Sequence, residues 1–292
     1  MKSTITLAAG LLFASTALAQ PAILTTVDDG GSGGENGAAV SAQVDKLQAA
    51  VLAGNLSPRS FDAVKTEITQ MGEGMSQTNP MAAQLGQRLT RRLADLQSRS
   101  QTGKATAQDF AILREQVIDT RIDYAISQIA TSAKASSTSP EQFAQVSSLL
   151  QARGAASVDI DPQGAESNQS VILVVSNMQK KAGVGDVSLP DISALRSRLA
   201  EARLDRAMTD LQTRAVTKVA SSEDYLRLNE VLADRTKVIG TPAAKQLELT
   251  LAAAIGELKA KAATGRVTKA DFSPLQTDII AKAREASGLQ AR

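Results

Sequence analysis

The sequence contains no cysteine, no histidine and no tryptophan. Without cysteine the chain can form no disulfide, so its folded state depends on the apolar core alone. Zinc, copper and haem sites lose their usual ligands, and Ser-His-Asp or Cys-His catalysis is excluded within this chain. Any general acid or base would have to be Asp, Glu, Lys or Tyr. These absences favour a protein that is not an enzyme and that carries no metal and no cofactor.

An excess of charge of one sign and long apolar runs are also missing. The chain has 32 basic and 30 acidic residues, a formal net charge of +2. This balance gives no electrostatic reason to expect nucleic acid or an anionic membrane as a partner. After the N-terminus, the longest aliphatic run is VILVV at 171–175, which is far shorter than the roughly 20 residues of a membrane-spanning helix. We therefore expect no nucleic-acid partner and no integral membrane contact.

The N-terminus has the composition of a secretory signal peptide. Lys2 precedes the apolar run LAAGLLFA, and the small residues ALA at 17–19 suit cleavage before Gln20. Residues 1–19 are thus predicted to be a signal peptide, and the mature protein is expected to be secreted, either periplasmic or extracellular. The glycine-rich stretch VDDGGSGGENG then predicts a flexible linker over residues 20–37.

Aromatic residues are scarce, and almost all of those beyond the leader occupy one position of a repeated phrase. GKATAQDFAIL begins at Gly103, and GRVTKADFSPL begins at Gly265. Apolar residues recur 17 and 14 positions before this aromatic position and three and seven positions after it, in all six copies of the phrase. Such fixed spacing is typical of repeat architectures. The six copies centre on Phe61, Phe110, Phe143, Ile192, Tyr225 and Phe272.

Each copy predicts a helix, a short turn and a second, capped helix. Serine or threonine stands four residues before the aromatic position in all copies, and Asp109 and Asp191 are among the acids that complete a capping box. Spacings of three and four place the apolar residues on one helix face. We therefore expect an αα-hairpin in each copy, with Thr106 and Ser188 as helix caps and Phe110 as a core residue.

The hairpins themselves recur in pairs. The spacings between successive aromatic positions are 49, 33, 49, 33 and 47 residues, which gives a longer period of 82 residues. The predicted fold is all-α, with six αα-hairpins arranged as three tandem four-helix units over residues 38–119, 120–201 and 202–292. The shorter spacings contain no helix breaker, so helices from 107 to about 135 and from 189 to about 217 should be shared by adjacent units. Units displaced along such helices would make an elongated molecule.

The repeated phrase resembles the second half of an EF-hand calcium loop. Gly103, Thr106, Asp109 and Phe110 follow the order of that motif. The carboxylates that should precede the glycine as calcium ligands are absent, because Ser98 and its neighbours stand at those positions. A degenerate EF-hand-like, cation-responsive regulatory module is therefore the alternative function, and helix capping explains the same residues without calcium.

Two segments place acids one helical turn apart around an arginine. Paired carboxylates can perform acid–base chemistry, whereas an arginine nearby favours a solvated or salt-bridged helix face. The occurrence of an equivalent pair in two repeats favours the structural interpretation. The pairs are Asp119 and Asp123 around Arg121, and Glu201 and Asp205 around Arg203.

Helical arrays commonly present extended surfaces to protein partners. The sequence therefore favours an exported, non-catalytic structural or protein-interaction module of the cell envelope or extracellular space. Its expected partner is another protein or a second copy of itself, and a small-molecule ligand is not expected.

Overall fold

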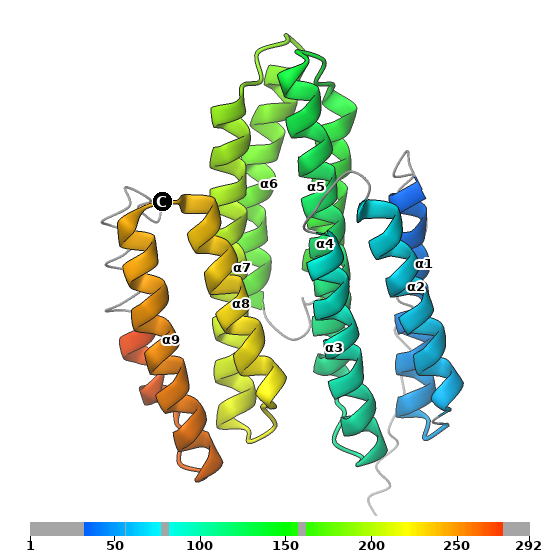
Figure 1. The fold of residues 1–292 in the computed structure, drawn as a ribbon, viewed down its shortest axis with the longest axis vertical. Helices are drawn as coiled ribbons and strands as arrows, with labels where there is room; N and C mark the ends of the chain where they lie inside the picture. Colours follow the sequence, from blue (N-terminus) through cyan, green and yellow to red (C-terminus); the bar gives the residue numbers. More distant parts are fainter. Residues whose placement is uncertain (1–31, 56, 77–81, 157–161, 277–292) are drawn as a thin grey trace, which may run out of the picture.

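The computed structural model describes residues 32–55, 57–76, 82–156 and 162–276. This part of the chain contains nine α-helices, one 3-10 turn and no β-strand, which confirms the all-α fold class (Figure 1). The predicted signal peptide, residues 1–19, lies outside the described residues. The helices are α1 (Ser32–Leu52), α2 (Pro58–Ser76), α3 (Ala82–Gln101), α4 (Ala107–Lys134), α5 (Pro140–Ala155), α6 (Pro162–Ala182), α7 (Leu189–Val216), α8 (Ser222–Ile239) and α9 (Pro242–Ala263), followed by the 3-10 turn η2 (Lys269–Asp271).

Six turns between helices share one backbone feature, a left-handed residue seven positions before the aromatic position of the repeat. Glycine adopts this conformation freely, while other residues are strained there by about 1–2 kcal/mol. In the turn after α3, Lys104 N–H donates to the Arg99 carbonyl at 2.8 Å, which ends the helix. The six left-handed residues are Gly54, Gly103, Ser136, Gly185, Lys218 and Gly265.

The predicted helix caps are present. Thr106, Ser139, Ser188, Ser221 and Thr268 each precede a helix in an extended conformation and belong to a capping box. At the start of α7, Asp191 N–H donates to the Ser188 hydroxyl at 3.4 Å, and Ser188 N–H donates to the Asp191 carboxylate at 3.0 Å. These bonds satisfy backbone donors that the first turn of a helix leaves free.

The repeat positions form the core, as predicted. Phe110 and Phe272 are both fully buried, and the described apolar residues at the other repeat positions are buried with them. Most of the buried apolar side chains fall into three clusters, over residues 40–117, 118–202 and 204–275. The breaks between clusters lie in the middle of α4 and α7.

The long helices are confirmed, but the linear arrangement expected from them is wrong. Both α4 and α7 run unbroken for 28 residues. The chain nevertheless folds back on itself, because α4 packs against α7 and α3 against α8 (Figure 1). The α5–α6 pair therefore lies at one end of the molecule, and the helices before and after it lie side by side. Charged side chains on α4 and α7, described below, hold this contact.

The N-terminal boundary also differs from the prediction. Helix α1 begins at Ser32, so residues 32–37 of the predicted flexible linker are helical. The buried Val40, Val44 and Leu47 anchor α1 in the core, and extension of an anchored helix is far easier than its nucleation. Composition alone had suggested a linker there. Among the described residues, no helix is long and apolar enough to cross a membrane.

Candidate functional site in a buried ionic layer

The contact between the two sides of the molecule is made by arginine and carboxylate side chains. We call residues 82–119 of α3 and α4 the first arm, and residues 203–239 of α7 and α8 the second arm. None of the three apolar clusters combines residues of both arms. The ionic layer consists of Arg88, Arg91, Arg92, Arg99, Asp109, Glu115 and Asp119 of the first arm and Arg203, Arg206, Asp210, Arg214, Asp224, Arg227, Glu230 and Asp234 of the second arm.

The two arms carry the same charge pattern and pair reciprocally. Arg88 of the first arm pairs with Asp234 of the second. In return, Arg203 of the second arm donates to Asp119 of the first at 3.0 Å. Adding 115 to a residue number converts Arg88 to Arg203, Arg91 to Arg206, Arg99 to Arg214, Asp109 to Asp224, Glu115 to Glu230 and Asp119 to Asp234.

A second pair of contacts obeys the same relation. Arg206 Nε donates to the Glu115 carboxylate oxygens at 3.1 and 3.2 Å, and both side chains are almost fully buried. The equivalent Arg91 pairs with Glu230. Such reciprocity is the property of a two-fold, self-complementary interface, and here both halves belong to one chain.

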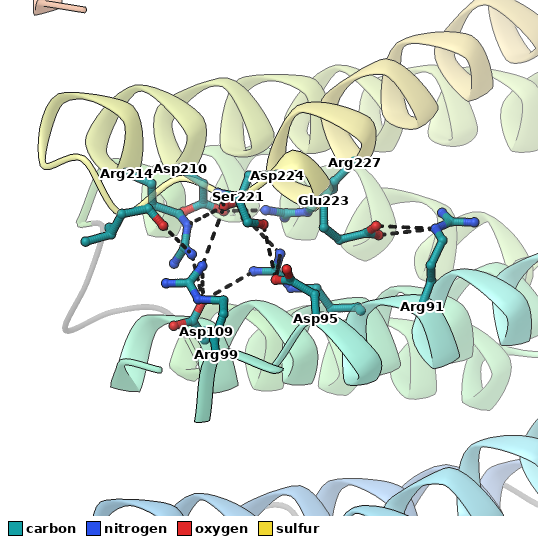
Figure 2. A network of polar contacts seen from close by, with 12 residues as sticks. Arg91, Asp95, Arg99, Asp109, Asp210, Arg214, Ser221, Glu223, Asp224 and Arg227 are labelled. Atoms are coloured by element: carbon teal, nitrogen blue, oxygen red, sulfur yellow. Dashed lines mark hydrogen bonds and ion pairs between the residues drawn. The ribbon is translucent and has the colours of Figure 1, made fainter. Parts of the chain in front are cut away.

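Arg214 binds one carboxylate of each arm (Figure 2). It donates to Asp109 at 2.7 Å and to Asp224 at 2.9 Å, and its side chain is 0% exposed. Arg92 donates to the other oxygen of Asp224 at 2.8 Å, and Arg99 lies 3.1 Å from Asp109. Hydrogen bonds between two ionised groups are shorter and stronger than neutral ones, so this cluster fixes α3, α4, α7 and α8 relative to one another.

The two carboxylates that bind Arg214 are also part of helix caps. Asp109 accepts a bond from Thr106 N–H at 2.7 Å, and Asp224 accepts one from Ser221 N–H at 2.7 Å. Each cap therefore holds its carboxylate in a fixed orientation at the start of α4 or α8. The same carboxylate binds arginines of both arms, so the turn chemistry of the repeat positions the ionic layer.

The arginines change how these acids titrate. Burial by itself raises the pKa of Asp224, but the charges of Arg92 and Arg214, together with the Ser221 N–H bond, bring it down to about 2. Burial likewise opposes ionisation of Asp119, and Arg153 and Arg203 outweigh it, so its pKa is lowered. These two carboxylates are thus held in their charged form as partners of arginine.

Glu115 behaves differently because it is more completely enclosed. Burial raises the pKa of Glu115 above its usual value despite the nearby charges of Arg153 and Arg206. A raised pKa in a carboxyl group is a property of many catalytic acids. Glu115 is 0% exposed, however, so no substrate reaches it in this conformation.

The structure brings together one of the two carboxylate pairs predicted from sequence. Asp119 and Asp123 both bind Arg203, at 2.9–3.0 Å, and Asp119 also accepts from Arg153 at 2.9 Å. The salt bridges were predicted, but Arg121 had been expected as the partner, and the arginine that binds both acids comes from α7. Of the two expected settings, solvated or salt-bridged, Asp119 has the salt-bridged one, and it faces the second arm.

One acid of the second predicted pair, Glu201, is buried and bound by an arginine. Glu201 is only 8% exposed and lies 2.6 Å from Arg235 of α8. It therefore belongs to a buried contact between α7 and α8 rather than to a solvated face.

The acids of the EF-hand-like phrase are used in caps and ion pairs. Asp109 binds Arg214 and Thr106 as described, and Asp271 accepts from Thr268 N–H at 2.7 Å and pairs with Lys261. The described part of the chain contains no group of three or more His, Cys, Asp or Glu side chains that could hold a metal ion.

Sequence reasoning did not find the ionic layer. Arg92, Asp210 and Arg227 were not predicted as site residues, because charged residues on helices usually lie in solvent. A signal was nevertheless present. The second and fifth copies of the repeat, 115 residues apart, align the arginines and acids of the two arms, whereas the 82-residue period aligns Arg88 and Arg91 with Ser170 and Leu173.

Comparison of this chain with protein-family models, with curated protein sequences and with solved structures finds no match.

Proposed function

We propose that this chain is an exported, non-catalytic helical-repeat protein that serves as a structural or protein-interaction module of the cell envelope or extracellular space. The observation that carries this proposal is the use of its acids. The carboxylates best placed for acid–base chemistry, such as Asp119 and Asp123, are bound by arginine. The arginines lower the pKa of Asp119 despite its burial, so this acid stays ionised, stabilises the interface and is a poor proton carrier.

We further propose that the repeat is organised as three tandem four-helix units, over residues 38–119, 120–201 and 202–292. Three separate apolar clusters, each drawn from one continuous stretch of chain, support this division. The left-handed residue at the same place in six turns supports six equivalent hairpins.

In this proposal, the ionic layer sets the relative orientation of the first and third units. The apolar clusters stabilise each unit by itself and do not determine how one unit is oriented relative to another. The ion pairs form only when the two arms are aligned in one register. Buried ion pairs contribute more to such specificity than to net stability in several systems. A fixed pair of arms presents the outer faces of α1–α2 and α9 in a constant geometry, which suits recognition of a protein partner.

The partner proposal is tested by capture from an extract of the producing cell's envelope. The bait is the mature chain, residues 20–292, and the comparison bait is the double variant Arg88→Ala, Arg203→Ala, which removes two reciprocal ion pairs. Lys245→Ala, at an exposed lysine, is the control. We expect a protein retained by the native chain and the control but lost with the double variant. Equal retention by all three baits, or retention of nothing, would contradict the proposal.

The export proposal is tested on the protein recovered from its own cells. N-terminal sequencing should find Gln20 as the first residue, and the protein should be in the envelope or medium. Recovery from the cytoplasm with Met1 in place would contradict export.

A further inference from the structure

A cavity lies at the free end of the second arm, on the side facing α9. It has a volume of about 350 Å³ and is bounded by the α7–α8 turn and by the C-terminal end of α9, which lie at the same end of the molecule (Figure 1). Lys218, Ser222 and Tyr225 line it from the first side, and Lys259 and Gly265 from the second. Pockets that bind small ligands have volumes of about 300–1,000 Å³, so this cavity is large enough for one.

Two residues of this cavity depart from the repeat. The left-handed turn position is glycine in four hairpins and serine in one, but here it is Lys218, with a φ of 60°. A long side chain in this conformation is strained. Strained residues occur most often at functional sites, where the surrounding structure holds them in place.

The second departure is Tyr225, which stands where the other hairpins have phenylalanine or isoleucine. Its side chain is 4% exposed, and its hydroxyl has no hydrogen-bond partner among the described residues. A buried hydroxyl without a partner is rare and calls for an explanation. Burial and the nearby Asp224 raise the pKa of Tyr225, so the hydroxyl remains a neutral donor. The phenylalanine of the other hairpins would fill the same space at no such cost.

Both charged residues that line the cavity in the described part of the chain are cationic. Lys218 and Lys259 line it, and no aspartate or glutamate does. The Lys218 ammonium lies against Gly265, 3.8 Å from the place that a Cβ atom would occupy there.

We propose that this cavity is a binding site for a small anion carrying a carboxylate or phosphate group. Lys218 and Lys259 supply the charge, and the Tyr225 hydroxyl donates the hydrogen bond that the apolar core leaves unsatisfied. The site extends the proposed function and amends the sequence-based expectation that the protein has no small-molecule ligand. It does not depend on the ionic layer.

The test uses the mature chain with inorganic phosphate and with succinate as probes, in buffers brought to the same ionic strength with sodium chloride. Calorimetry gives the binding constant, and thermal unfolding gives the shift in melting temperature, which a ligand specific for the native state must raise. We expect at least one probe to bind with one site per chain. A response to phosphate only assigns a phosphate ligand, and a response to succinate only assigns a carboxylate ligand.

Three variants separate binding from stability. Lys218→Gly and Tyr225→Phe restore the residues of the other hairpins, so each should raise the melting temperature of the free protein while weakening anion binding at least tenfold. Ser136→Gly, at the other strained turn, should raise the melting temperature and leave binding unchanged.

Two results would overturn the proposal. One is that neither probe raises the melting temperature beyond the effect of sodium chloride at the same ionic strength. The other is that Lys218→Gly binds the probe as tightly as the native chain. Lys218 would then only stabilise the C-terminal end of α9 through its charge.

Discussion

Replacement of Arg214 by methionine is the sharpest perturbation of the ionic layer. Methionine keeps much of the length and apolar volume of the side chain and removes only the guanidinium. Arg214 is 0% exposed and binds Asp109 and Asp224 at 2.7 and 2.9 Å. Its loss leaves two buried carboxylates with fewer partners, so the variant loses charge compensation rather than packing.

The expected loss of unfolding free energy depends on the arginines that still bind Asp109 and Asp224 in the variant. Removing one partner of a buried ion pair typically costs about 3–5 kcal/mol. Asp224 would keep Arg92 at 2.8 Å, and Asp109 would keep Arg99 at 3.1 Å. We therefore expect Arg214→Met to lose about 3 kcal/mol of unfolding free energy, at the lower end of that range.

Urea unfolding at neutral pH measures this loss. Arg99→Met is the matched variant at the equivalent position of the first arm, and it should cost less, about 1.5–3 kcal/mol, because Arg99 lies 3.9 Å from Asp224. Lys245→Met removes an exposed pair with Glu248 and should cost less than about 1 kcal/mol. An unfolding free energy of Arg214→Met equal to that of Lys245→Met would refute the reasoning.

Three further predictions concern single residues. Asp224 has a pKa of about 2 in the folded protein, below the roughly 3.9 of an unfolded aspartate. Its stabilisation is therefore complete above about pH 4 and lost as the pH falls towards about 2, and Asp224→Asn should make the acid limb of a stability–pH curve shallower. Phe110→Ala, at a fully buried site, should cost about 3–5 kcal/mol in urea unfolding, and an unchanged midpoint would exclude a core role. Ser188→Ala should cost about 1 kcal/mol, whereas Ser98→Ala, at an exposed position, should leave the melting temperature unchanged.

The parts of the fold that were predictable are those that local chemistry decides. Phe110 and its equivalents could be assigned to the core because burial of one helix face imposes an apolar period on the sequence. Ser188 could be assigned as a cap because its partner Asp191 is only three residues away. The helical state of residues 32–37 was missed because the packing of Val40 and Val44 overrides their composition.

The ionic layer was not predictable by the same means. Arg214 binds Asp109 across 105 residues of chain, and nothing local distinguishes it from a surface arginine. Lys218 illustrates a related limit, because a left-handed turn is recognisable from sequence only where glycine occupies it. In both cases, alignment of the equivalent hairpins identifies the residue, whereas its own segment of sequence does not.

The central claim is that the ionic layer closes the two arms against each other. The distance between spin labels on the two arms tests it most directly, and the absence of native cysteine allows labels at any two engineered cysteines. Gln87 of α3 and Lys237 of α8 are exposed and lie within one turn of Arg88 and Asp234, which pair across the layer. The account predicts one narrow, short distance distribution between Gln87→Cys and Lys237→Cys. A broad distribution that extends to long distances would show separated arms and contradict it.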